Sequence, residues 1–445
     1  MNQFNVSLWG DEAFSAVLSM KSVPEIIKII INDTSPPLFN LTEHFWFKAA
    51  GTSEVAIRSL VFVYFLVAVF FVFKIGSYLW DRKTGLLAAV LTFLNPFFFI
   101  YAFEGRMYSI LAATVTASMY FFVKRNWVGY VIATTLALYS HHFAIFALFV
   151  QGIWFLKEYF FGKRKVAVSI FKSFIAILIL YSPWLLPLYN QTKMVGGGFW
   201  LGTPTLIDLR NLIYKYLAEG IDHKFSQLAL ILVFITLIVR RWAKDFEKTF
   251  FLLSWFLGPI LLTWLVSQRF QSIFFDRYLL YTIPAGMLIV ASLGRKYTGI
   301  VIAILLPILF IIDFHYYTHP TKRPFRELAA YVKEFKRGDD ILINWNSSLH
   351  HLWESKYYGI PAPLYVPEGA ALPFYVGTAL MSESDIISSL PKRLPTKNVK
   401  VPTIAVGRVG VITSGEIDEI DLADYTKGEA VQFGDLKFVW FERSP

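Results

Sequence analysis

The stretch SLVFVYFLVAVFFVFKI, residues 59–75, carries only one charged side chain, Lys74. A second apolar stretch, residues 174–189, carries none. When they are helical, apolar runs of this length match the hydrocarbon core of a bilayer, which is about 30 Å thick. The two stretches therefore predict helices that cross a membrane.

Composition extends this prediction to most of the chain. Of 445 residues, 56% are hydrophobic and 18% aromatic, whereas only 17% are charged. A soluble chain of this length would need more charge to cover its surface, so most apolar side chains must face lipid. The net charge of +10 fits basic loops at a membrane surface, and nucleic acid is not expected as a partner. The chain has no cysteine, which excludes disulfides and thiolate chemistry.

The loops indicate how the chain is oriented in the membrane. Hydropathy predicts about ten spans, at residues 55–80, 85–102, 105–123, 127–140, 143–160, 167–189, 226–241, 248–268, 276–293 and 297–316. Basic residues occupy alternate loops, at 82–83, 124–125, 163–165, 240–244 and 295–296. By the positive-inside rule these loops lie in the cytoplasm. The other loops and the C-terminus of this integral membrane protein are therefore expected on the extracytoplasmic face.

The sequence changes character after about residue 317. Residues 325–335 have helical periodicity, and residues 338–340 form a turn. Short strands are predicted at 341–345, 362–366, 402–406, 409–413 and 436–442. We expect a transmembrane domain over 1–317, with a first extracytoplasmic loop at 1–54, and a soluble α/β domain over 318–445.

Polar clusters concentrate in the loops predicted on the extracytoplasmic side. Asp11 and Glu12 stand at the head of an amphipathic stretch that extends through Ile31. Adjacent acids at a helix start are often a cap and a first-turn charge. Alternatively, a carboxylate at the membrane surface could act as a general base for an incoming hydroxyl.

Arginines appear in two further clusters. Residues 104–108, EGRMY, lie at the tip of a predicted helical hairpin, where Arg106 could be neutralised by its neighbour or could hold a phosphate with two hydrogen bonds. Arg269 and residues 276–278, DRY, lie where a span enters the outer leaflet. Arg277 could simply snorkel to the interface, but arginines beside carboxylates also suit an anionic lipid that reacts with a hydroxyl.

Histidines and a glycine-rich loop complete the set of candidates. His44 follows the Pro36-Pro37 pair, and a lone loop histidine is more often hydrogen-bonded to its surroundings than a ligand or base. His141 and His142 are adjacent and do not face each other on a helix, so a shared metal is not expected. Residues 196–200, GGGFW, are a plausible acceptor-side loop.

Taken in order and spacing, these motifs resemble the GT-C superfamily of membrane glycosyltransferases. The nearest group is that of the protein O-mannosyltransferases and aminoarabinose transferases, which use polyprenyl-phosphate sugars. The resemblance covers the membrane part and rests on Asp11-Glu12, residues 35–38, residues 104–108, and residues 276–280 with Pro284.

The resemblance implies a GT-C fold of about ten transmembrane helices and an inverting transfer of sugar from a polyprenyl phosphate to an extracytoplasmic hydroxyl on protein, lipid or glycan. Asp11 would be the general base and Glu12 its acidic neighbour. Further substrate contacts would come from Arg106, Arg277, Tyr278, Tyr108, Glu104, Arg269 and His44. Neither a cofactor nor a metal is implied, because arginine can stabilise the leaving phosphate.

The chain departs from the group's pattern in two places. Members usually have a transmembrane helix before the Asp-Glu loop, whereas Asp11 here comes only ten residues after Met1. Some members have a lysine where this chain has Ser35, so one phosphate contact is expected to be either missing or supplied by Arg269.

A lipid or sugar transporter, or flippase, is the alternative from another class. It would place charged residues near the bilayer midplane and would show internal repeats. The sequence has neither feature, since Lys172 and Asp313 lie near the ends of predicted spans.

Overall fold

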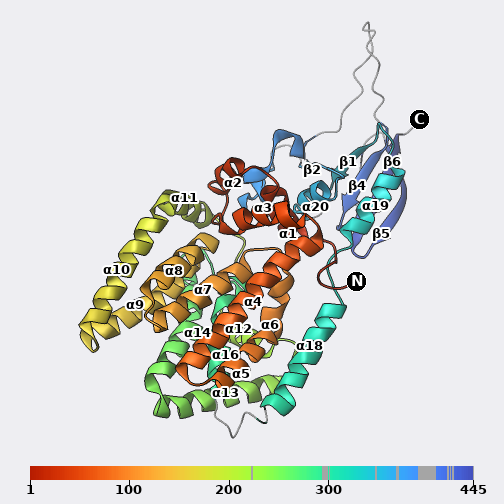
Figure 1. The fold of residues 1–445 in the computed structure, drawn as a ribbon. Coiled ribbons are helices and arrows are strands. Elements are labelled where there is room, and N and C mark those ends of the chain that lie inside the picture. The colour runs from red at the N-terminus through yellow and green to blue at the C-terminus, as the bar shows by residue number, and fades with distance from the viewer. Residues whose placement is uncertain are drawn as a thin grey trace.

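In the computed structural model, the chain forms a helical bundle that carries a sheet-containing domain at one end (Figure 1). The structure describes residues 1–221, 224–292, 301–345, 348–366, 370–388, 407–417 and 425–443, together with Gly299, Ile420 and Leu422.

Three short helices precede the first long apolar helix: α1 (Gly10–Ser19), α2 (Val23–Ile30) and α3 (Leu38–Ala50). The bundle contains α4 (Glu54–Leu79), α5 (Arg82–Phe93), α6 (Pro96–Ile100), η1 (Tyr101–Phe103), α7 (Tyr108–Val123), α8 (Trp127–Ser140), α9 (Ala144–Phe160), α10 (Arg164–Tyr181), η2 (Ser182–Trp184), α11 (Leu185–Gly196), α12 (Leu206–Ala218), α13 (Lys224–Lys244), α14 (Phe246–Ser267), α15 (Asp276–Leu279), η3 (Leu280–Thr282), α16 (Ile283–Ala291), η4 (Val301–Leu305) and α18 (Leu306–Thr318).

Within the described residues, each of the predicted spans coincides with a helix or with a broken helix. Among the described residues, five helices are long and apolar enough to cross a membrane, or six if the pair α5 and α6 counts as one bent span. The bend of 61° in that pair comes at Asn95-Pro96, where proline cannot continue the hydrogen-bond ladder and Asn95 caps the new helix. Helices α7 and α8 are shorter. The count of ten spans therefore stays a prediction.

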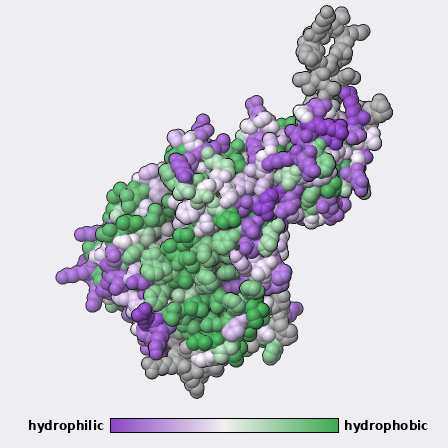
Figure 2. All heavy atoms as spheres, turned by 45° about the vertical axis from the view of Figure 1, so that its right-hand side comes forward, coloured by the Kyte–Doolittle hydropathy of each residue, from purple (hydrophilic) through white to green (hydrophobic). Residues whose placement is uncertain are grey.

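The outer surface of the bundle is that of an integral membrane protein. Phe70, Ile179 and Phe310 are each more than half exposed, and Figure 2 shows hydrophobic residues over most of the helical body. Hydrophilic residues gather instead over the C-terminal domain (Figure 2). Large apolar side chains on an exposed surface are expected where lipid replaces water.

The C-terminal domain is built on a six-stranded sheet of order β3-β2-β1-β4-β6-β5. Its elements are α19 (Phe325–Phe335), β1 (Ile341–Asn344), α20 (His351–Tyr357), β2 (Leu364–Tyr365), η5 (Phe374–Val376), η6 (Thr378–Leu380), η7 (Glu383–Asp385), β3 (Ile386–Ile387), β4 (Val409–Thr413), β5 (Tyr425–Phe433) and β6 (Leu436–Arg443). Strands β1, β2, β3 and β4 run parallel, whereas β4, β6 and β5 pair antiparallel. This is the α/β architecture that the sequence predicts.

Most of the predicted elements of this domain are confirmed. Helix α19 and strands β1, β4 and β6 lie at their predicted places, and β2 is shorter than predicted. The strand predicted at 402–406 lies outside the described residues. The sequence does not predict β3, α20 or β5. Strand β5 is an edge strand with mostly exposed, polar residues, so it lacks the alternation of a half-buried strand.

The amphipathic stretch predicted from Asp11 through Ile31 is not one helix. Helix α1 ends at Ser19, and a second helix starts at Val23 with Ser22 and Glu25 forming a capping box. Pro24 is tolerated there because the first turn of a helix has no backbone acceptor for its N–H. The break places α2 and α3 across the end of the bundle that carries the C-terminal domain (Figure 1).

Candidate functional site

The two predicted acids face different surroundings because successive residues on a helix point about 100° apart. Helix α1 begins at Gly10, and its N-cap residue Trp9 is extended. The Asp11 side chain is 17% exposed, whereas the Glu12 side chain is completely buried. Asp11 is therefore accessible to a ligand, whereas Glu12 is not.

Glu12 lies at the centre of an ion-pair network. Its Oε2 is 2.8 Å from Arg58 Nη2 and 2.9 Å from Lys322 Nζ, and its Oε1 accepts a hydrogen bond of 2.8 Å from the Gly105 N–H. Burial alone would raise the pKa of this carboxyl, but Arg58 and Lys322 outweigh burial and lower the pKa to about 2. Glu12 is thus held ionised inside the protein.

The same network includes Glu104. Lys322 Nζ is 3.2 Å from Glu104 Oε2, and the Trp9 indole donates to Glu104 Oε1 at 2.8 Å. Arg58 also donates to the backbone carbonyls of Phe4, Val6 and Ser7. The network joins the N-terminal segment, α4, the loop before α7 and the linker after α18.

Gly105 is required by this arrangement. A Cβ at this position would lie 2.6 Å from Ile57 Cγ2 and 3.3 Å from Glu12. Only a residue without a side chain can bring its N–H to the Glu12 carboxylate there, which gives the glycine of the EGR motif a packing reason.

Asp11 lies beside two arginines and a histidine at the edge of this network. Its Oδ2 is 3.5 Å from Arg277 Nη1, and its Oδ1 is 3.7 Å from His350 Nδ1. Arg106 Nη1 donates to the Asp11 backbone carbonyl at 3.3 Å and to Ser15 Oγ at 2.6 Å. Burial raises the pKa of Asp11, but Arg106, Arg277 and His350 together bring the pKa below its usual value. Asp11 is therefore an ionised, partly accessible proton acceptor.

The two arginines keep unused hydrogen-bond donors. In the described part of the chain, the Nε atoms of Arg106 and Arg277 are buried without a hydrogen-bond partner. The Arg277 guanidinium lies 5.7 Å from the ring centre of Trp9, 5.5 Å from that of Tyr108 and 4.8 Å from that of Phe275. Aromatic walls hold a guanidinium in place without consuming its N–H groups. Unpaired buried donors are costly, so this pair of arginines fits an anionic ligand.

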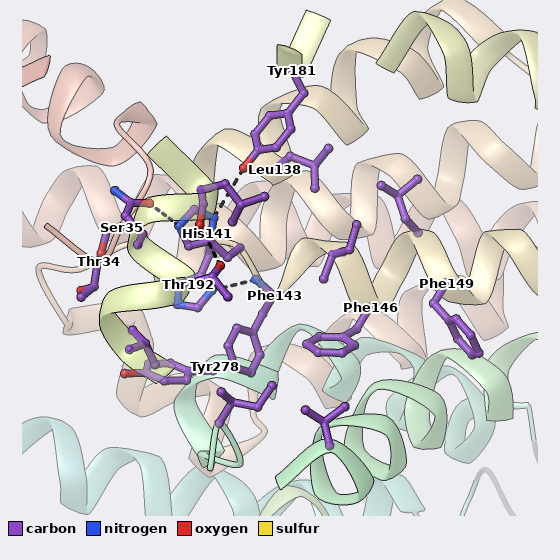
Figure 3. A pocket seen from close by; sticks show the side chains of 18 of the residues that line it. Thr34, Ser35, Leu138, His141, Phe143, Phe146, Phe149, Tyr181, Thr192 and Tyr278 are labelled. Carbon is purple, nitrogen blue, oxygen red and sulfur yellow. Dashed lines mark hydrogen bonds between the residues drawn. The ribbon is translucent and has the colours of Figure 1, made fainter. Parts of the chain in front are cut away.

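A cavity of about 1000 Å³, lined at one end by Arg106, extends into the bundle. Arg106, His141 and Tyr278 line it together with Thr34 and Ser35. Most of the remaining lining is aliphatic and aromatic side chains of α8, α9, α10, α11 and α14. Figure 3 shows the polar residues Thr34, Ser35 and His141 gathered at one end and Phe146 and Phe149 toward the other. The cavity therefore has a polar head and a long apolar body.

Aromatic packing ties the head of this cavity to the arginines. The Tyr278 ring lies 5.0 Å from the rings of both His141 and Phe143, and 6.2 Å from that of Tyr108. Burial lowers the pKa of His141 well below its ordinary value, and the neighbouring His142, Arg106 and Arg277 act in the same direction. His141 is therefore neutral at pH 7 and can hydrogen-bond without adding charge.

Most of the predicted site residues come together, and two do not. Arg106 and Tyr278 line the head of the cavity. Asp11 contacts Arg106, Tyr108 packs on Tyr278, and Arg277 lies beside Asp11 and Tyr108. Glu12 and Glu104 belong to the buried network. The His44 ring nitrogen Nδ1 is instead 2.9 Å from the carbonyl of Ser19. Arg269 is exposed after α14, and its side chain does not line the cavity.

Three participants have no signal in the sequence: Arg58, Lys322 and His350. His141 belongs to the adjacent histidine pair, but the sequence does not indicate that it lines a cavity. Arg58 lies within the first apolar helix and Lys322 in a linker, where neither shows periodicity or a motif. His350 approaches Asp11 from 339 positions away in sequence. Among the described residues, no group of three or more His, Asp and Glu side chains is arranged to hold a metal ion.

Comparison with known proteins identifies the fold. Neither a protein-family model nor a curated protein sequence matches the chain, but solved structures do. ArnT from Cupriavidus metallidurans in its apo state has a TM-score of 0.64 at 12% identity, over 98% of this chain and 93% of that chain. The same protein bound to undecaprenyl phosphate has a TM-score of 0.63 at 12% identity, over 98% and 95% of the two chains.

A more distant match is the Archaeoglobus fulgidus oligosaccharyltransferase in complex with zinc and sulfate. Its TM-score is 0.50 at 11% identity, over 85% of this chain and 59% of that chain. These neighbours are glycosyltransferases of the GT-C type. At such low identity, the likeness concerns the path of the chain and not its ligands.

Proposed function

We propose that this integral membrane protein of the GT-C fold is an inverting glycosyltransferase that moves a sugar from a polyprenyl-phosphate carrier to a hydroxyl acceptor. The observation that carries the proposal is the position of Arg106. Its side chain lines the apolar cavity and also donates to the backbone carbonyl of Asp11. A lipid-sized cavity and an accessible carboxylate therefore meet at a cationic group.

The donor fits the two parts of the cavity. Its isoprenoid chain matches the apolar body, and its phosphate matches the unpaired Nε donors of Arg106 and Arg277. Hydrogen bonds between a guanidinium and a charged oxygen contribute about 1.5–3 kcal/mol each. One structural neighbour, ArnT, is bound to undecaprenyl phosphate, which supports a carrier of this class here.

The chemical step needs a group that stabilises the leaving phosphate and a base for the acceptor proton, and the site offers candidates for both. The acceptor oxygen attacks the anomeric carbon while the bond from that carbon to the phosphate oxygen breaks, and the bonding electrons leave with the phosphate. Arg106 and Arg277 stabilise the charge that develops on the leaving group. Asp11 Oδ takes the acceptor proton, which then passes to water. One displacement from the face opposite the phosphate inverts the anomeric centre.

The lowered pKa of Asp11 fits a late proton transfer. A weakly basic carboxylate stays ionised at pH 7 and accepts the proton once the attacking oxygen has become acidic in the transition state. Arginine supplies the electrostatic stabilisation that a divalent metal supplies elsewhere, so we propose that no metal takes part.

The orientation of the site follows from the basic loops. Asp11, the loop before α7, the loop between α8 and α9 and the C-terminal domain meet at one end of the bundle (Figure 1). Within the described residues, the basic segments at 82–83, 124–125, 163–165 and 240–244 lie at the opposite ends of the helices. We therefore propose that transfer takes place on the extracytoplasmic face.

The test is transfer itself. Purified protein in lipid nanodiscs would be given a panel of short-chain polyprenyl-phosphate sugars with and without EDTA, and mass spectrometry would follow the loss of sugar from the lipid. We expect the wild type to consume one donor, Asp11→Asn to be inactive, and the exposed-acid control Asp208→Asn to match the wild type. Persistence of sugar transfer in the presence of EDTA would support a metal-free step. Consumption of no donor would overturn the proposal and favour a transporter or flippase.

A further inference from the structure

The C-terminal domain packs directly against the helix that carries Asp11. Helix α20 lies against α1, and the Trp353 and Phe14 rings are 5.3 Å apart at 74°. Leu352 and Trp353 belong to the same buried apolar cluster as the core of the bundle. The interface is therefore a continuation of the bundle core and not a loose contact.

Gly10 sets how closely the two helices approach. A Cβ on Gly10 would lie 2.2 Å from the Cβ and 3.3 Å from the Cα of His350. Because the nearest atoms belong to the first carbon and the backbone of His350, no rotation of a side chain could make room. Glycine before Asp11 is thus the condition for His350 to lie where it does.

His350 is turned toward the Asp11 carboxylate. Its Nδ1 lies 3.7 Å from Asp11 Oδ1. That nitrogen is buried and has no hydrogen-bond partner among the described residues, although the side chain as a whole is 29% exposed. A buried ring nitrogen that points at a carboxylate from just beyond hydrogen-bond distance is poised to close onto it when a substrate fills the site.

We propose that His350, on the soluble domain, is a positioning residue that fixes the proposed base Asp11 from the side opposite Arg277, so that the catalytic site is complete only while this domain is docked. The inference rests on the proposed function. It assigns to the C-terminal domain a part in the chemistry beyond that of a cover or an acceptor platform.

The surroundings explain why a histidine suits this place. Asp11 on α1 and Arg106 before α7 act on the ring from other elements, and Glu354 and His351 act on it from α20 itself. Burial lowers the pKa of His350, and Arg106 and His351 add to this effect, which outweighs the opposing effect of Asp11 and Glu354. A neutral imidazole donates Nδ1–H to Asp11 without adding a third full positive charge, which would weaken the base.

The first test compares variants that differ only at position 350. Asn places a side-chain amide at the position of Nδ1, whereas Gln reaches the position of Nε2 and Ala offers no donor. We expect kcat to fall about tenfold to 100-fold in His350→Ala and His350→Gln, to recover substantially in His350→Asn, and KM for the donor to stay unchanged. His319→Ala, an exposed histidine of the linker, is the matched control.

The pH profile separates positioning from packing. In the wild type, we expect protonation of His350 to weaken the base at a higher pH than that at which Asp11 is protonated, so that the acidic limb of kcat reports the histidine. In His350→Asn this limb should move to lower pH. An unchanged limb, or equal activity of the Ala, Gln and Asn variants, would overturn the proposal.

A second variant disturbs the contact without altering either partner. Gly10→Ala should push α20 away from α1 and lower kcat as His350→Ala does, and the double variant should be no slower than either single variant. Full additivity would contradict a shared contact. Normal transfer by His350→Ala, with Asp11→Asn inactive, would remove the role of His350 and leave the proposed function intact, whereas an inactive wild type would remove both.

Discussion

Replacing Glu12 and Asp11 one at a time should separate a folding role from a chemical role in two adjacent acids. Glu12→Gln removes a charge that Arg58 and Lys322 enclose. A carboxyl whose pKa falls from 4.5 to about 2 on folding stabilises the folded state by about 3 kcal/mol at neutral pH. Neutralising one partner of a buried pair costs about 3–5 kcal/mol in other proteins. We therefore expect Glu12→Gln to lose about 3 kcal/mol of unfolding free energy.

For turnover, we expect the reverse order: Asp11→Asn should lower kcat much more than Glu12→Gln does. The amide of Glu12→Gln keeps the shape of the side chain and an oxygen for the Gly105 N–H, so kcat should stay within about fivefold of the wild type under conditions where the variant is folded. Asp11→Asn should lose about 10²–10⁴ in kcat, the range that a general base contributes. Its loss of stability should be smaller, because Asp11 is partly exposed.

Denaturant unfolding in detergent, followed by tryptophan fluorescence, measures the first quantity, and donor consumption measures the second. Glu25→Gln, an exposed acid in the capping box of α2, is the control for amide substitution. Because the folded pKa of Glu12 lies below 4.5, its contribution is present above about pH 4.5 and is lost as the pH falls toward 2. A Glu12→Gln variant with wild-type stability and no turnover would refute the assignment of Glu12 to the network.

Further predictions follow from the arginines, the cavity and the topology. Arg277→Ala should raise KM for the donor and lower kcat, so that kcat/KM falls by about 10²–10³. Arg277→Lys should restore little of the lost kcat/KM, since lysine lacks the planar guanidinium. Steady-state kinetics would measure kcat and KM of each variant. Leu178→Trp, at a half-exposed position of the cavity wall, should raise KM for a long-chain donor more than for a short-chain one, and equal effects on both would argue against a chain-binding cavity. The chain has no cysteine, so single cysteines can be introduced and labelled one at a time. In intact cells, an impermeant maleimide should label Glu429→Cys on the extracytoplasmic side and should not label Lys83→Cys in the cytoplasm. The reverse pattern would invert the proposed orientation.

Much of the bundle could be predicted because apolar length and basic loops are local properties of the sequence. The run at residues 59–75 becomes the middle of α4. The basic segments at 82–83, 124–125 and 163–165 fall where one helix ends and the next begins, and residues 240–244 end α13. The sequence could not show that α5 and α6 form one bent pair, because the bend depends on how Asn95 caps the helix after Pro96. It also could not show β5, whose pairing with β6 is made by backbone groups and needs no apolar alternation.

Only part of the candidate site can be predicted from the sequence. Asp11, Arg106 and Arg277 stand in short motifs and could be found, whereas Arg58, Lys322 and His350 are single residues whose meaning depends on tertiary contact. The sequence also does not show that Asp11 and Glu12 have different roles. Helical spacing predicts that the two side chains point in different directions, but not which of them is buried. Glu12 is enclosed because Arg58, near the start of α4, pairs with it, and no local pattern in the sequence marks Arg58.

Charge balance during transfer leads to a last prediction. A polyprenyl-phosphate sugar is a phosphodiester with one negative charge, and the phosphomonoester that leaves approaches two near pH 7. The phosphate thus gains about one negative charge in the step in which Asp11 loses its own by accepting a proton, so the total charge beside Arg106 and Arg277 is unchanged.

Asp11→Asn should therefore bind the product lipid more tightly than the wild type while it fails to transfer sugar. In the free wild type, the ionised Asp11 carboxylate repels a phosphomonoester bound several ångströms away. With the arginines and solvent screening the two charges, removing that repulsion is worth about 1–3 kcal/mol, or about five- to 150-fold in Kd. Titration of a short polyprenyl phosphate followed by native mass spectrometry would measure both constants, with Asp208→Asn as the control. Equal affinity in Asp11→Asn and the wild type would mean that the phosphate does not lie beside Asp11, and then the arginines, the carboxylate and the cavity would not form one site.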